Sequence, residues 1–149
     1  MNLNTDNFVS KLLEWYSENG RSFFWRNHTL NKFETLLTEM LLKRTRAETV
    51  DNHITSILEK LTSPEKTLSL SREEIINTIK PLGLYERRSK NLISVCNSLL
   101  SDYSGDVPEK KEYLIEINGI GEYIADAVLS FACNKPVVVI DTNVAVVSK

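Results

Sequence analysis

Residues 117–144 read INGIGEYIADAVLSFACNKPVVVIDTNV and contain the features that decide the fold. The stretch opens with a tight turn around Gly119 and Gly121, continues as a helical apolar pattern and ends in a valine-rich segment before Asp141. Glycine allows positive φ and close approach of the backbone to another surface. A helix that begins near Gly121 directs free N–H groups outward, which makes an anion site suited to a phosphate. A simple turn between two helices has the same pattern, so the turn alone leaves both interpretations open.

The chain before this turn also follows helical periodicity. Apolar residues recur at i, i+3, i+4 and i+7, as they do in residues 33–41. Thr45 with Glu48 has the spacing of a capping box and predicts a helix start. Ser71 with Glu74 has the same spacing and predicts another.

The valine-rich segment, residues 137–140, is the one stretch whose composition favours a strand. It has no second candidate strand to pair with, and an isolated strand is not stable. We therefore expect an extended, buried linker there and an all-α fold for the chain. A length of 149 residues is enough for one domain or two small lobes.

The distribution of charge is more informative than the net charge of −2. A negative total is a mild argument against nucleic-acid binding, because phosphate contacts need lysine and arginine. Basic residues nevertheless gather in two clusters, namely Lys43, Arg44 and Arg46, and Arg87, Arg88 and Lys90. Since such clusters are usually a solvated surface, they alone do not establish a nucleic-acid partner.

The sequence lacks the features of membrane, secreted and metal-binding proteins. The apolar run at residues 136–140 is too short to cross a bilayer, and residues 1–7 lack the basic start and apolar stretch of a signal peptide. Cys96 and Cys133 lie in apolar helical patterns, where we expect buried free thiols in a reducing compartment. The two histidines have no partners at metal-ligand spacing. We expect a cytoplasmic protein, nucleoid-associated if prokaryotic, with no membrane partner and no metal.

Two further stretches complete a set of ordered motifs. Residues 23–50 read FFWRNHTLNKFETLLTEMLLKRTRAETV, and residues 82–92 read LGLYERRSKNL. Together with the hairpin and Asp141, they resemble the helix-hairpin-helix DNA glycosylases, which include endonuclease III, the adenine glycosylases and the thymine–guanine mismatch glycosylases. The family hairpin has the form L-P-G-[IV]-G; here Ile117 and Asn118 replace Leu-Pro, while the spacing to Asp141 fits. The resemblance covers almost the whole chain.

The resemblance implies that Asp141 is a catalytic residue. Breaking a base–sugar bond develops positive charge on the sugar, and a fixed carboxylate stabilises that charge. The same carboxylate can orient or deprotonate the attacking water. Asp141 is followed by Thr142 and Asn143, which is also good capping sequence for a helix start, and a capping carboxylate is held rigidly. The two roles are therefore compatible.

The resemblance also gives roles to Tyr123 and Glu39. Tyr123 occupies the position where bifunctional members have the lysine that forms a Schiff base with the sugar, and tyrosine cannot form one. We therefore expect a monofunctional, water-using enzyme. Glu39 matches a family glutamate that lines the base pocket, where it hydrogen bonds or donates a proton to the departing base.

The expected partner is double-stranded DNA with a mispaired or damaged base. Arg44 matches the family position that fills the space left by the flipped nucleotide. The other members of the two basic clusters are candidates for phosphate contacts: Lys43, Arg46, Arg87, Arg88 and Lys90. Gly119 and Gly121 belong to the hairpin that approaches the DNA backbone.

The expected reaction is hydrolysis of the N-glycosidic bond of thymine or uracil opposite guanine. Two alternatives stay open: removal of adenine opposite guanine or oxidised guanine, and a DNA-binding repair module without catalysis. Many family members carry a four-cysteine iron–sulfur cluster beyond the aspartate. Its ligands are not encoded here, so we expect no cofactor.

The resemblance implies two helical lobes. We expect a six-helix barrel over residues 23–135 that contains the hairpin, and an incomplete second lobe formed by residues 1–22 and 136–149. The sequence ends at Lys149, soon after an apolar surface that includes Val144, Val146 and Val147. We expect one of three explanations: a fragment, a degenerate member, or a lobe completed by another copy of the chain.

Overall fold

The computed structural model describes residues 5–147, and helices are the only regular elements in that range. Their order is α1 (Thr5–Asn19), α2 (Phe24–Asn27), α3 (Lys32–Leu42), α4 (Ala47–Lys60), α5 (Pro64–Leu68), α6 (Arg72–Ile79), the 3-10 turn η1 (Lys80–Leu82), α7 (Tyr85–Tyr103), α8 (Lys111–Glu116), α9 (Glu122–Phe131) and α10 (Thr142–Val147). The predicted all-α fold is confirmed. None of these helices is both long and apolar enough to cross a membrane.

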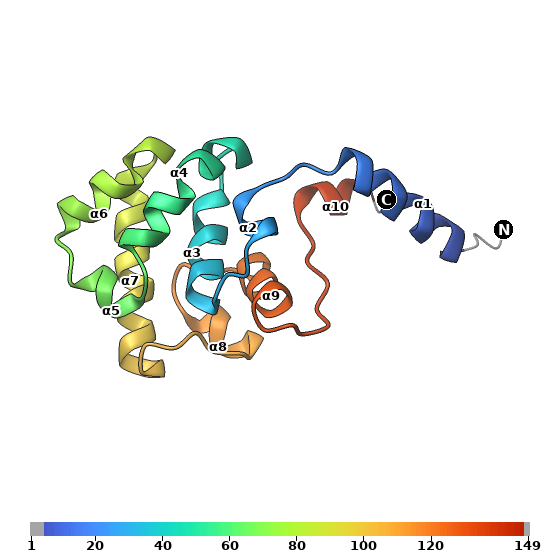
Figure 1. Cartoon of the computed structure of the whole chain (residues 1–149). Coiled ribbons are helices and arrows are strands. Elements are labelled where there is room, and N and C mark those ends of the chain that lie inside the picture. The colour runs from blue at the N-terminus through green and yellow to red at the C-terminus, as the bar shows by residue number, and fades with distance from the viewer. Residues whose placement is uncertain (1–4, 148–149) are drawn as a thin grey trace.

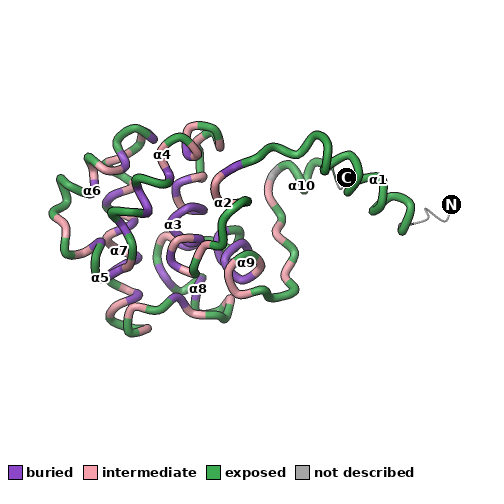
Figure 2. Tube along the Cα trace, in the orientation of Figure 1, coloured by how far each residue is buried: buried purple, intermediate pink, exposed green. Residues whose placement is uncertain are grey.

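One apolar core joins the helices from α3 to α9. Helix α3 packs against α4 and α9, α7 packs against α5 and α6, and α8 packs against α9. Figure 2 shows the buried residues concentrated on the facing sides of these helices. Leu36, Ile54, Val95 and Val128 are each completely buried. Burial of a side chain of this size stabilises the fold by about 1.5–3 kcal/mol, so this core holds the helices that surround the hairpin.

Two local signals in the sequence have different outcomes. The Ser71–Glu74 capping box forms at the start of α6 as predicted. The Thr45–Glu48 spacing correctly predicts a helix start, since α4 begins at Ala47, but the capping box itself does not form, because Arg46 precedes α4 without any side-chain capping bond. The hydroxyl of Thr45 is used elsewhere: it accepts a hydrogen bond from the guanidinium of Arg88 on α7. A tertiary partner has replaced the local one.

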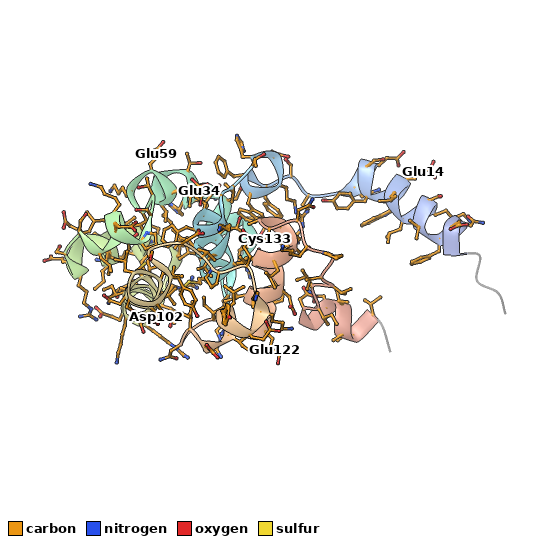
Figure 3. The ribbon with its side chains drawn as sticks, turned by 90° about the horizontal axis from the view of Figure 1, so that it is seen from below. Glu14, Glu34, Glu59, Asp102, Glu122 and Cys133 are labelled. Atoms are coloured by element: carbon orange, nitrogen blue, oxygen red, sulfur yellow. The ribbon has the colours of Figure 1, made fainter. Side chains whose placement is uncertain are left out.

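The terminal helices differ from the rest of the chain. Figure 1 shows α1 projecting away from the other helices, and Glu14 on α1 lies well apart from Glu34 and Cys133 in Figure 3. Helices α1 and α10 overlap in Figure 1 but are separate in Figure 3. Apolar side chains of α1 such as Leu13 and Trp15 are exposed. The division into a barrel at residues 23–135 and a partial lobe stays a prediction.

The segment at residues 137–140 is not the buried linker that we expected. It has no helix or strand hydrogen bonding, but Val138 is 72% exposed and Ile140 is 58% exposed. The reason is its position: Val137 still packs against the core after α9, but the chain then leaves the core, and within residues 5–147 nothing buries Val138 or Ile140. Its apolar composition predicted burial, while its surroundings in the described chain leave it open.

Candidate active site

The hairpin between α8 and α9 uses its two glycines differently. Ile117 and Ile120 are buried and anchor the turn in the core, as predicted. Gly119 has φ +108°, and a Cβ atom there would lie 2.1 Å from Oδ1 of Asn91 on α7. Gly121 has φ −91°, caps α9 without any side-chain bond, and has open space where a Cβ would stand. Gly119 therefore shapes the turn, whereas Gly121 leaves the N-terminus of α9 accessible.

A cleft of about 530 Å³ lies where the starts of α9 and α10 meet the end of α3. We call it the acid cleft. Its lining residues are Leu42, Lys43, Arg44, Gly121, Tyr123, Ile124, Ile140, Asp141 and Asn143. The fold thus brings Arg44, Tyr123 and Asp141 to one cleft, although they are distant in sequence. The volume is within the range typical of ligand sites.

Asp141 is held in the acid cleft by two donors at the start of α10. Its Oδ1 accepts a hydrogen bond from the backbone N–H of Val144 at 2.7 Å, and its Oδ2 accepts one from Nδ2 of Asn143 at 3.2 Å. The capping role of Asp141 is therefore confirmed. Because both oxygens accept hydrogen bonds, the carboxylate has a fixed orientation, which electrostatic stabilisation of a developing charge requires.

Glu39 on α3 lies behind Tyr123 on α9. Glu39 is only 5% exposed, and burial raises the pKa of its carboxyl, while a hydrogen bond from the Tyr123 hydroxyl acts in the opposite direction. Burial and the proximity of Glu39 raise the pKa of Tyr123 to about 12, so its hydroxyl is a neutral donor at physiological pH. The Oε2 atom of Glu39 is buried and has no hydrogen-bond partner among the described residues.

A second cleft, of about 490 Å³, lies between α3, α7 and the hairpin. We call it the basic cleft. Its lining residues are Met40, Lys43, Arg44, Leu84, Arg87, Arg88, Lys90, Asn91, Ser94, Asn118 and Gly119. Five of these are cationic and none is a carboxylate, so the described lining of this cleft favours anions. The negative net charge of the chain conceals this local surplus.

The two basic clusters of the sequence meet at the basic cleft, with one exception. Lys43 and Arg44 come from the turn after α3, and Arg87, Arg88 and Lys90 come from α7. Arg46 lines neither cleft and is the residue before α4. Sequence reasoning gave no role to Leu84, an exposed residue in the left-handed conformation at φ +50° that also lines the cleft. The position of Leu84 after Gly83 in the sequence does not indicate that its side chain is exposed.

The turn of residues 43–46 separates the two clefts, and we call it the dividing turn. Lys43 and Arg44 line both clefts. Arg44 has φ +62°, a left-handed conformation that is unfavourable for a residue other than glycine. The position of Arg44 between the clefts therefore depends on contacts that keep the dividing turn in this conformation.

The cysteines do not fit the iron–sulfur cluster that many family members carry, which needs four thiolates. The chain has two cysteines, both free. Cys96 is buried in α7, and burial raises its pKa to about 12. Cys133 was expected to be buried but is partly exposed, because it follows the end of α9. Within residues 5–147 no cluster of His, Cys, Asp and Glu side chains could hold a metal ion.

Comparison with known proteins identifies the family of this chain. A family model described as "HhH-GPD superfamily base excision DNA repair protein" matches residues 37–149. The chain therefore belongs to the HhH-GPD superfamily.

Within that superfamily the chain is similar to thymine-DNA glycosylases. The thymine-DNA glycosylase of Aeropyrum pernix is 34% identical over 134 residues, which cover 89% of this chain and 60% of that protein. The thymine/uracil-DNA glycosylase of Methanothermobacter thermautotrophicus is 32% identical over 136 residues, covering 91% and 61%. The solved structure of a thermostable thymine-DNA glycosylase has a TM-score of 0.85 at 30% identity, covering 93% of this chain and 63% of that chain. The chain thus spans about 60% of the length of these curated relatives.

Proposed function

We propose that this protein is a DNA glycosylase that hydrolyses the N-glycosidic bond of thymine or uracil mispaired with guanine. The observation that carries the proposal is the acid cleft, where the fixed carboxylate of Asp141 lies with Tyr123 in front of the buried Glu39. Its similarity to thymine-DNA and thymine/uracil-DNA glycosylases supports the choice of base.

Asp141 and Glu39 have complementary tasks in this proposal. The Asp141 carboxylate stabilises the positive charge that develops on the sugar and orients the attacking water. Burial raises the pKa of Glu39, which favours the protonated carboxyl that can donate a proton toward the departing base. Tyr123 orients the Glu39 carboxyl through its neutral hydroxyl.

The reaction leaves an intact abasic strand in this proposal, because Tyr123 has no amine for a Schiff base. Lys43 is the single lysine among the described residues that line the acid cleft. Borohydride should therefore trap no covalent complex between the protein and a mismatched duplex. A trapped adduct in the wild type that disappears in Lys43→Met would show that Lys43 performs lyase chemistry and would refute the monofunctional mechanism.

Double-stranded DNA is the proposed partner, and the basic cleft is the proposed phosphate surface. The exposed cations Lys43, Arg87 and Lys90 there would neutralise phosphates. The accessible N-terminus of α9 at Gly121 would add backbone donors. Arg44 lies on the dividing turn between this surface and the acid cleft, where a side chain can enter the space left by a flipped nucleotide.

Base release from a panel of mismatched duplexes tests the proposed function. The panel contains thymine or uracil opposite guanine, adenine opposite guanine, adenine opposite oxidised guanine, and matched controls. We expect release of thymine or uracil only, without strand cleavage before alkali treatment. Release of adenine would refute the choice of base. Binding without release of any base would refute catalysis and would favour a DNA-binding module.

A further inference from the structure

Arg88 projects from α7 to the backbone at the end of α3. Its Nη1 donates to the carbonyl oxygen of Leu41 at 2.6 Å, and its Nη2 donates to the carbonyl oxygen of Lys43 at 2.9 Å. Nη2 also donates to the hydroxyl of Thr45. The side chain is half-buried, and burial lowers its pKa from the usual arginine value. One guanidinium thus joins three points across the end of α3 and the dividing turn.

These bonds have a physical reason in the helix end. The last carbonyl groups of a helix have no partner within the helix, and they carry partial negative charge that a cation stabilises. The planar guanidinium fork reaches several acceptors at once, which a lysine cannot do. The left-handed conformation of Arg44 persists only if its surroundings hold it. The bonds of Arg88 to Lys43 and Thr45 lie on either side of Arg44 and supply that hold.

Arg87 provides an internal contrast. It is the adjacent residue, has the same charge and lines the same basic cleft. Arg87 is exposed and has no hydrogen bond or ion pair with any described residue. Arg87 is therefore available for a phosphate, whereas both terminal nitrogens of Arg88 already bond to the protein. This use of Arg88 differs from the phosphate contact that the sequence suggested.

We propose that Arg88 is a positioning residue, which fixes the dividing turn and thereby places Arg44 between the acid cleft and the basic cleft. The effect on base excision rests on the proposed function, whereas the hold on the turn does not. Without Arg88, Arg44 leaves its left-handed conformation, and a nucleotide that enters the acid cleft loses the side chain that would fill its vacated space. Loss of such positioning affects the excision step more than DNA binding.

The first experiment measures amide hydrogen exchange in the free protein. The backbone N–H of Thr45 donates to the carbonyl oxygen of Leu42 at 3.2 Å, so its exchange reports on the dividing turn. In Arg88→Met we expect exchange of this amide to accelerate roughly tenfold, a factor that corresponds to the free energy of about one hydrogen bond. Exchange in Arg87→Met should be unchanged. Equal exchange in wild type and Arg88→Met would overturn the proposal, whether or not the protein excises bases.

The second experiment separates positioning from phosphate contact. The single-turnover excision rate of Arg88→Met should fall by roughly 10- to 100-fold, as misplacement in an active site can cause, with the salt dependence of DNA binding unchanged. Arg87→Met should lower the slope of log affinity against log salt by about 0.9, with a smaller effect on the rate. Arg88→Lys keeps a charge that would suffice for a phosphate. Recovery of the wild-type rate in Arg88→Lys, or a reduced slope in Arg88→Met, would overturn the proposal.

A milder pair of variants guards against loss of folding in Arg88→Met. Thr45→Val removes the hydroxyl that Arg88 bonds, while Thr45→Ser keeps it. Fluorescence of 2-aminopurine beside the mismatch reports on nucleotide flipping, and thermal unfolding sets a temperature at which each variant is fully folded. We expect Thr45→Val to reduce the flipping signal and Thr45→Ser to preserve it. Equal signals in the two variants would overturn the positioning role. If the wild type releases no base, the proposed function fails while the exchange experiment still decides the role of Arg88.

Discussion

The acid cleft and the basic cleft have similar volumes and share one wall, yet their linings differ in kind. The acid cleft has one fixed carboxylate, a tyrosine and a buried glutamate behind it, and few charges. The basic cleft has five cations. The carboxyl groups of the first are expected to act on the chemical step, and the cations that line only the second and face solvent are expected to act on binding and its salt dependence. Variants of the carboxyl groups should therefore change the excision rate, whereas variants of these cations should change the DNA affinity and its salt dependence.

The largest effect is expected for Asp141→Asn. The amide keeps the size of the side chain but cannot stabilise positive charge on the sugar, so the excision rate should fall by at least ~100-fold. Affinity for a mismatched duplex should be unchanged within a factor of about three, because the basic cleft is intact. Single-turnover kinetics and a binding titration measure the two quantities.

Asp102→Asn is the matched control for this variant. Asp102 lies near the end of α7 and lines neither cleft, so its amide variant should excise at the wild-type rate. Full activity in Asp141→Asn would remove this carboxylate from the mechanism.

The hairpin offers a comparison within one turn, because Gly119 lines the basic cleft and Gly121 lines the acid cleft. Gly119→Ala should lower the free energy of unfolding by about 1–3 kcal/mol, since its φ is +108° and the new Cβ would approach Asn91. Gly121→Ala should change it by less than about 0.5 kcal/mol. Chemical denaturation measures both.

Gly121→Ala also tests the phosphate site at α9. Its methyl group would occupy space that is open in the protein, so weaker DNA binding by a fully stable variant would come from contact with the ligand. Unchanged DNA affinity in Gly121→Ala would contradict close approach of the DNA backbone to this helix end.

The fold class, the hairpin anchors, two residues of the acid cleft (Tyr123 and Asp141) and the buried Glu39 behind Tyr123 could be predicted from the sequence. Motif spacing places Glu39, Tyr123 and Asp141 in the order that the family shares, and the structure brings them to one place. The role of Arg88 could not be predicted, because whether a cation meets solvent or a helix end depends on how α7 packs on α3. The Thr45–Glu48 spacing predicts the start of α4 but not the absence of the capping box, because the Thr45 hydroxyl accepts a hydrogen bond from Arg88 instead.

The pH dependence of excision tests the role of Glu39 as a proton donor. The pKa of Glu39 is raised by burial, so the wild-type rate should fall as pH rises through that pKa and the proton is lost. Glu39→Gln cannot donate a proton, so we expect a rate lowered by roughly tenfold or more at mildly acidic pH and no such decline. Rates across pH 5 to 9 measure this.

The raised pKa of Glu39 also affects the stability of the folded protein. A raised folded-state pKa stabilises the protein below the unfolded-state pKa, and that contribution disappears as pH rises through the folded-state value. Glu39→Gln should therefore become more stable relative to wild type as pH increases in this window. The exposed Glu59→Gln on α4 is the control and should follow wild type. An unchanged difference in stability across pH would show that Glu39 is not held in its neutral form.

The smallest expected effect concerns Lys90, which lines the basic cleft and is exposed. Lys90→Met should weaken binding to matched and mismatched duplexes by the same factor, because a phosphate contact does not depend on sequence. Its slope of log affinity against log salt should fall by about 0.9, whereas the slope for Asp141→Asn should equal that of wild type. The single-turnover rate at saturating protein should not change. A loss of affinity confined to the mismatched duplex would mean that Lys90 contributes to base recognition. The assignment of binding to the basic cleft and of chemistry to the acid cleft would then be wrong, because Lys90 lines the basic cleft alone.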